Sequence, residues 1–91
     1  MIDVDELVRL IEKSGMHVEN RERTKDGTTY LLSEMEDRSG GWLTFKDEQL
    51  PLILERIRAV KVTRNKEKSA CRMHDELHAI EMEIHNGVFG R

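Results

Sequence analysis

Hydrophobic positions near the N-terminus follow the spacing of one helix face. They recur three or four residues apart, at Val4, Leu7, Val8 and Ile11. Asp3 stands where an N-cap residue belongs, and Gly15 can take the left-handed conformation that ends many helices. The pattern predicts a helix over residues 4–14.

A β-hairpin is predicted next, because Asp26-Gly27 lies between two extended-looking segments and is a typical hairpin turn. A two-residue turn there would place Thr24 opposite Thr29. One face of the hairpin would then carry Val18, Leu31 and Met35, and the other Arg21, Arg23, Tyr30 and Leu32. Since the first strand is largely polar, we expect it at an edge of the sheet.

Residues 36–41 (EDRSGG) have the composition of a loop, and residues 42–45 (WLTF) resemble a short third strand. The acidic residues before this loop are Glu34, Glu36 and Asp37. They lack the spacing of a calcium-binding loop, so we interpret them as solvated turn residues.

A second helix is predicted directly after the third strand. Its apolar stripe consists of Leu50, Ile53, Leu54, Ile57 and Val60. Asp47 and Glu48 place negative charge in its first turn, which is favourable at a helix N-terminus. Pro51 implies either that the regular helix begins there or that residues 46–50 form a tighter entering turn.

The chain after Pro51 contains no Gly or Pro until Gly87, but its apolar pattern is interrupted. The stripe disappears over residues 61–69 and resumes in a new phase at Ala70, Met73, Leu77, Ile80 and Ile84. We therefore predict a break near Asn65 and a third helix that ends at Asn86-Gly87. One continuous rod is the alternative, and its length would favour dimerisation.

These elements define a small single α+β domain in the order α-β-β-β-α-α, with a three-stranded antiparallel meander packed on helices. Residues 1–64 form the predicted core, and residues 65–91 form a C-terminal helical segment of the same domain that projects or pairs in a dimer. With 91 residues, of which 37% are hydrophobic, the core is expected to be thin. Self-association would add burial.

The last apolar stripe is the predicted interaction surface. It consists of Met73, Leu77, Ile80, Ile84 and Phe89. These features favour a non-enzymatic accessory or regulatory protein, of the kind common in bacterial and phage genomes. It would act as a homodimeric protein–protein interaction module, with itself and an unidentified protein as partners.

Charge is unevenly distributed, although the formal net charge is only −3. Residues 55–72 hold seven basic and two acidic residues, and the rest of the chain is acidic. The basic residues are Arg56, Arg58, Lys61, Arg64, Lys66, Lys68 and Arg72. They suggest an alternative function, a nucleic-acid-binding regulator in which this segment contacts phosphates. The few aromatic residues make a poor base-stacking platform.

Cys71, His74 and His78 lie on one face of the predicted third helix, and the two histidines have a spacing that can bind zinc. A structural zinc site needs a fourth ligand, and the HDELH motif has Asp75 where zinc proteases have glutamate. We therefore expect these residues to border the apolar stripe, with metal binding as the alternative. No cofactor and no catalytic set is predicted.

No apolar run reaches the roughly 18 residues needed to span a membrane, and the N-terminus lacks the pattern of a signal peptide. Cys71 is the single cysteine, so no disulfide forms within the chain. The sequence favours a cytoplasmic protein without a membrane partner.

Overall fold

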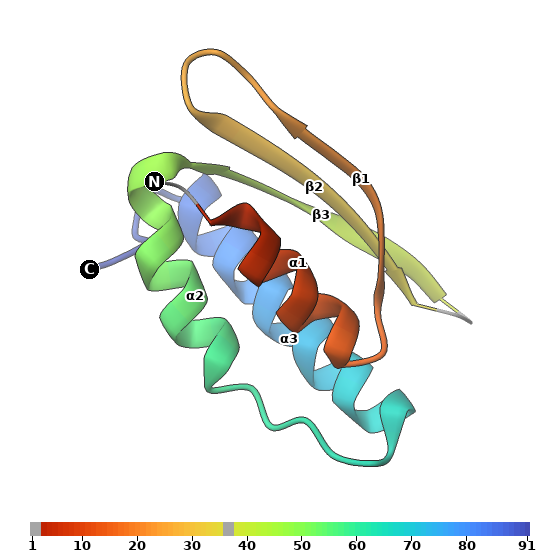
Figure 1. The fold of residues 1–91 in the computed structure, drawn as a ribbon. Helices are drawn as coiled ribbons and strands as arrows, with labels where there is room; N and C mark the ends of the chain where they lie inside the picture. Colours follow the sequence, from red (N-terminus) through yellow and green to blue (C-terminus); the bar gives the residue numbers. More distant parts are fainter. Residues whose placement is uncertain (1–2, 36–37) are drawn as a thin grey trace.

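The structure is a computed structural model that describes residues 3–35 and 38–91. It confirms the predicted α+β domain. The elements are α1 (Val4–Lys13), β1 (His17–Arg23), β2 (Thr28–Met35), β3 (Arg38–Lys46), the short 3₁₀ helix η1 (Asp47–Gln49), α2 (Leu50–Arg58) and α3 (Lys66–His85). The strands form an antiparallel sheet in the order β1-β2-β3. The three helices cover one face of this sheet and leave the other face open (Figure 1).

The predicted helix boundaries are confirmed by the caps. The Asp3 side chain accepts a hydrogen bond from the Glu6 backbone N–H at 3.0 Å, which satisfies one of the free donors of the first turn of α1. Asn65 caps α3 in the same way, accepting from the Lys68 N–H at 3.1 Å. The chain therefore breaks before α3, as predicted, and does not continue from α2 as one rod.

The predicted register of the β1–β2 hairpin is wrong by one residue. Arg23, not Thr24, lies opposite Thr29. The reason is the turn: among the described residues only glycines have positive φ, so Asp26 does not take the conformation that a two-residue type I′ turn requires. Gly27 alone does, at φ 84°, and the loop contains one residue more.

This shift changes the face on which the β1 side chains lie. Arg21 and Arg23 lie opposite Leu31 and Thr29, toward the helices, where they form ion pairs with Asp5 and Asp47. The predicted placement of the two arginines beside Tyr30 is therefore wrong. A β-bulge between Val18 and Asn20 restores the alternation, so Val18 faces the core together with Leu31, as predicted.

Strand β3 begins earlier than predicted. Residues 38–41, expected in a loop, belong to the strand, because the β2–β3 ladder continues past Trp42 to a pair between Met35 and Arg38. The predicted loop residues 36 and 37, with their two acidic side chains, lie outside the described residues. Pro51 lies in the first turn of α2 and is preceded by the tighter η1 turn, which is one of the two predicted arrangements.

A single hydrophobic core lies between the sheet and the helices. Its central residues are Leu7, Ile11, Leu31, Leu43, Phe45, Ile53, Ile57, Met73 and Ile80, each at most 3% exposed. Helix α3 does not project; it lies back against the sheet and contributes its apolar stripe to this core. No helix in the described part of the chain is long and apolar enough to cross a membrane.

Candidate binding groove

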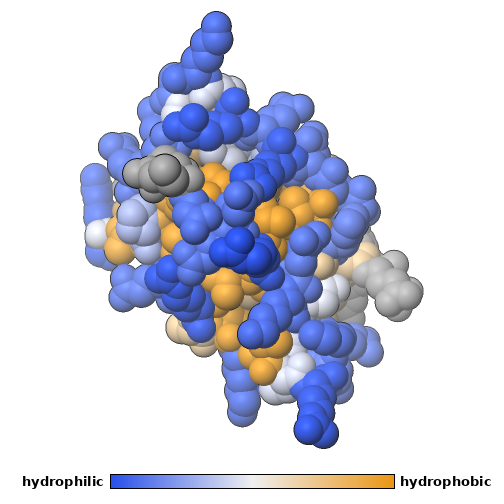
Figure 2. Space-filling model, viewed as in Figure 1, coloured by the Kyte–Doolittle hydropathy of each residue, from blue (hydrophilic) through white to orange (hydrophobic). Residues whose placement is uncertain are grey.

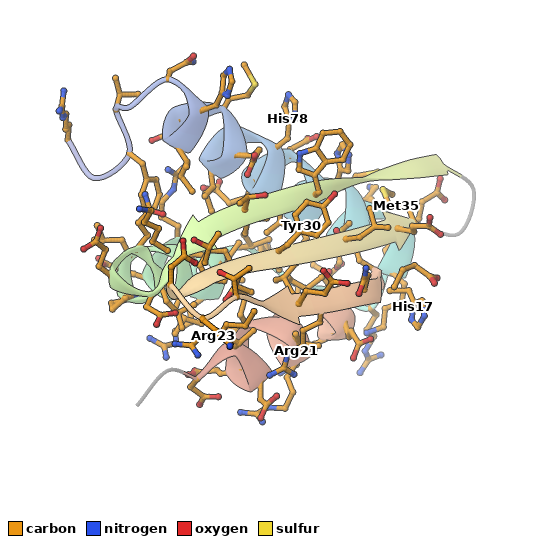
Figure 3. The ribbon with its side chains drawn as sticks, turned by 90° about the horizontal axis from the view of Figure 1, so that it is seen from above. His17, Arg21, Arg23, Tyr30, Met35 and His78 are labelled. Carbon is orange, nitrogen blue, oxygen red and sulfur yellow. The ribbon has the colours of Figure 1, made fainter. Side chains whose placement is uncertain are left out.

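A groove of about 430 Å³ opens between the core-facing side of the sheet and α3. Helix α3 runs along the β3 side of the sheet, and α1 lies on the β1 side (Figure 3). The residues that line the groove are Ile11, Met16, Leu31, Ser33, Gly41, Trp42, Leu43, His74, Leu77, His78, Glu81, Met82 and His85. Its volume falls within the range of ordinary ligand pockets, roughly 300–1,000 Å³.

The groove exists because one row of the sheet carries small residues. On the core-facing side, Leu31 pairs with Leu43, whereas the next row pairs Ser33 with Gly41. A methyl group added at Gly41 would meet no atom within 4 Å, so space remains beside this residue. The large side chains that fill the rest of the core are therefore replaced here by a recess.

Helix α3 provides a rim of histidines. The rings of His74 and His78 are parallel, with centroids 6.4 Å apart and an interplanar angle of 2°. His85 lines the groove further along the same helix. Figure 3 shows His78 on α3 at the β3 side of the sheet. Imidazole rings combine an apolar body with N–H groups that bind anionic or carbonyl oxygens.

The backbone of β3 forms the opposite rim. The Thr44 N–H donates to the Glu81 carboxylate on α3 at 2.8 Å, and the Lys46 N–H donates to the Gln49 side-chain oxygen at 2.8 Å. Both N–H groups point away from β2. On that side β3 has no neighbouring strand, because it is an edge of the sheet. Helix α3 and η1 thus cover part of this edge with side-chain acceptors.

Two exposed apolar side chains flank the groove. Trp42 is 59% exposed and Met82 is 45% exposed, on β3 and α3 respectively. In the view of Figure 2, apolar atoms reach the surface in patches between hydrophilic side chains. Trp42 is the only tryptophan of the chain, so its exposure places its largest aromatic group beside the groove and outside the core.

The predicted interaction stripe lies mostly inside the single chain. Met73, Leu77 and Ile80 are 1%, 7% and 0% exposed, and only Leu77 among them reaches the groove wall. Ile84 and Phe89 are half-buried and pack against the core. The Arg56 guanidinium carbon lies 6.0 Å from the centre of the Phe89 ring. The sheet of the same chain therefore covers most of the stripe, for which the sequence predicted a separate partner.

The structure places the three candidate metal ligands in two different surroundings. His74 and His78 line the groove, whereas Cys71 is half-buried one turn earlier and is not part of its wall. The His74 Nδ1 atom lies 3.6 Å from the Asp75 carboxylate. Within residues 3–35 and 38–91, no three potential ligand side chains converge as a metal site.

Two members of the basic segment are engaged in ion pairs within the chain. Arg56 binds Glu76 and Glu83 on α3, each at 2.6 Å, and Arg58 binds Glu6 on α1 at 2.6 Å. Burial lowers the pKa of Arg56, but its hydrogen bonds to the two carboxylates raise it, and the net shift is upward. These arginines join α2 to its neighbours.

The remaining basic residues gather at the loop between α2 and α3 and in the first turns of α3. Arg72 donates to the Lys61 backbone carbonyl at 3.4 Å, and the Lys66 ammonium donates to the Lys13 carbonyl at 2.9 Å. The side chains of Lys61, Arg64 and Lys68 are exposed. The exposed basic residues are therefore concentrated at the α2–α3 loop, called the basic end below. The seven basic residues do not form one continuous positive surface.

Comparison with protein-family models, with curated proteins and with solved structures gives no match for this chain. The groove is therefore interpreted from its geometry. The sequence indicated His74 and His78 but missed Gly41, Trp42 and Met82. Gly40-Gly41 directly before an aromatic residue is a signal that could have suggested an open, irregularly filled strand.

Proposed function

We propose that this protein is a non-enzymatic protein–protein interaction module, and that the groove between β3 and α3 is its docking surface. The observation that carries the proposal is the combination of an apolar recess with two exposed apolar side chains, Trp42 and Met82, on its rims. A recess that receives one side chain, flanked by large apolar residues, is the usual anatomy of an interaction hot spot.

The energetics of such docking depend on the recess and on Trp42. Burying one apolar side chain contributes roughly 1.5–3 kcal/mol, and a tryptophan that becomes covered adds a comparable amount. Two such contacts contribute roughly 3–6 kcal/mol, so backbone hydrogen bonds and further side-chain contacts must offset the cost of association and supply the rest of the roughly 8 kcal/mol that micromolar binding needs. This strength suits an accessory or regulatory protein that binds its partner reversibly.

Self-association, expected from the sequence, remains part of the proposal but has a different physical basis. The α3 stripe is buried within one copy, so a dimer would have to use the groove rims or the open face of the sheet. Sedimentation over a wide range of concentrations measures this directly. A constant monomer mass would remove the homodimer and leave the groove available to another protein.

A nucleic-acid-binding regulator is the second candidate, favoured by the exposed Lys61, Arg64 and Lys68 at the basic end. Binding through phosphates weakens steeply with salt, by roughly one power of the salt concentration for each contact. A titration of random DNA and RNA at increasing salt therefore separates the two functions. Tight, salt-sensitive binding that is lost in a Lys61→Gln, Arg64→Gln, Lys68→Gln variant would favour this candidate.

Selection from a random peptide library displayed on phage tests the interaction module. We expect enriched peptides that bind with micromolar Kd. Trp42→Ala and Met82→Ser should each weaken this binding about tenfold, since each removes an apolar contact of about 1.4 kcal/mol. Leu52→Ser is the matched control, because Leu52 is similarly exposed, at 44%, on α2. The proposal fails if no peptide is enriched, or if the bound peptides ignore both groove variants.

A further inference from the structure

We propose that the groove binds an extended peptide segment of a partner protein, which adds to β3 as a fourth strand and places an apolar side chain in the recess beside Gly41. This inference rests on the proposed function and specifies the chemistry of the partner. It combines three features of the described residues: a partly open strand edge, a recess below that edge and a histidine rim.

The open part of the edge is at Trp42. In an antiparallel ladder the N–H and C=O of one residue point to the same side, and the side alternates from residue to residue. Thr44 donates outward, to Glu81, and Trp42 lies two residues earlier in an unbroken register with β2. The Trp42 backbone groups therefore point outward as well, toward the groove.

The chain covers this edge unequally. Side-chain oxygens of Glu81 and Gln49 accept from the N–H groups of Thr44 and Lys46, which blocks strand addition there. For the Trp42 N–H, the described residues supply no side-chain acceptor. The uncovered donor lies at the groove, where an incoming backbone can satisfy it, as in other peptide complexes formed by strand addition.

The recess fits the side chains of an added strand. Cross-strand neighbours share a face, so a residue beside Gly41 would point to the core-facing side, into the space that Gly41 leaves open. There it would contact Leu77 and His78. Its neighbours along the peptide would point to the open face, next to the exposed Trp42 indole. The peptide would therefore alternate between a buried apolar position and positions facing solvent.

The rim of the groove also offers polar groups to an added peptide. The ionisable groups that line it are His74, His78, Glu81 and His85, and the Glu81 carboxylate is already hydrogen-bonded to the Thr44 N–H. The imidazole N–H groups of His78 and His85 are available to donate to carbonyl oxygens of the peptide.

The first test uses a capped synthetic peptide with the sequence most enriched in the phage selection. It is N-methylated at one position at a time. N-methyl groups on the amides that face β3 should weaken binding about tenfold, because each removes a backbone hydrogen bond, while those on the alternate amides should change Kd less than about twofold. Hydrogen exchange of the Trp42 amide should slow on binding.

Two protein variants separate the backbone from the side chain. Trp42→Ala removes the indole, whereas Trp42→Pro removes both the indole and the N–H, which proline tolerates on an open edge. We expect Trp42→Pro to bind more weakly than Trp42→Ala by a further factor of about ten. Gly41→Leu should abolish binding by filling the recess. Circular dichroism melts should remain close to wild type, since Gly41 has open space beside it.

Equal binding by all N-methylated peptides, or by Trp42→Pro and Trp42→Ala, would overturn strand addition while leaving the interaction module intact. Failure of every groove variant to affect peptide binding would instead remove the proposed function itself.

Discussion

At the tip of the β1–β2 hairpin, one carboxylate organises the turn. Asp26 accepts hydrogen bonds from the Thr24 hydroxyl and from the Thr28 backbone N–H. These contacts, led by the Thr24 hydroxyl, hold the pKa of Asp26 below its usual value. Gly27 follows with a φ of 84°, and a methyl group there would lie 2.9 Å from an Asp47 carboxylate oxygen. Of the predicted turn pair Asp26-Gly27, only Gly27 has a positive φ.

The substitution Asp26→Asn should change how stability depends on pH. Because the pKa of Asp26 is lowered in the folded protein, its stabilising contribution is present above the unfolded-state pKa of about 3.9 and is lost as the pH falls through the folded value. The difference in unfolding free energy between wild type and variant should thus be constant from about pH 5 to 7 and shrink below about pH 4. Urea unfolding at several pH values measures it, and an equal difference at low pH would contradict the assignment.

Among the elements, the junction between α2 and α3 depends on polar side chains. Asn65 caps α3, and the buried Ser69 hydroxyl accepts from the Thr63 N–H at 2.8 Å. These contacts turn the chain sharply without Gly or Pro. They replace the helical hydrogen bonds that a continuous rod would have formed.

The substitution Asn65→Ala tests this junction. We expect it to lower the free energy of unfolding by about 1 kcal/mol, since it leaves a first-turn N–H of α3 without its acceptor. Asn86→Ala is the matched control at the other end of α3, where the cap uses the backbone only, and should cost less than about 0.5 kcal/mol. Equal losses at the two ends in urea denaturation would argue against a specific capping role.

Across the whole molecule, Arg56 joins α2 to two turns of α3. Its guanidinium binds Glu76 and Glu83, and it also lies over the Phe89 ring. The three charged side chains are only 30% to 35% exposed, so the pairs are partly shielded from water. The basic segment therefore has a structural role in part, independent of any nucleic acid.

A double-mutant cycle with Arg56→Met and Glu83→Gln measures this contact. We expect a coupling energy of about 0.5–1 kcal/mol, in the range of partly exposed ion pairs, and a smaller value at high salt. Urea is the denaturant of choice, because guanidinium chloride is a salt and would itself screen the ion pair. A coupling energy near zero at low salt would show that the arginine contributes only its packing.

How far the sequence predicted the fold depends on the kind of interaction. Caps and helical periodicity are local, so Asp3, Asn65 and the breaks between helices were correctly placed. The hairpin register was wrong, because Asp26 and Gly27 permit more than one turn and the backbone of Asp26 keeps a negative φ. The extent of β3 was underestimated, because pairing with β2 extends the strand into residues with loop composition.

The candidate site was less predictable. The sequence placed His74 and His78 on one face of α3, but the groove also needs the small row at Ser33 and Gly41, which lie far away in the chain. Their pairing depends on the strand register, and the exposure of Trp42 depends on which face of the sheet the helices cover. The hydrophobicity pattern of a sequence does not predict a cavity between two secondary-structure elements.

The sequence by itself determined the number, type and order of the elements and their capping, because these follow from contacts between residues close in the chain. Only the tertiary structure decided what the α3 stripe is used for. The stripe was expected to lie against a partner, but it fills the core beneath the sheet. The physical reason is that burial is a sum over contacts from distant segments, and local periodicity tells which face is apolar but not what covers it.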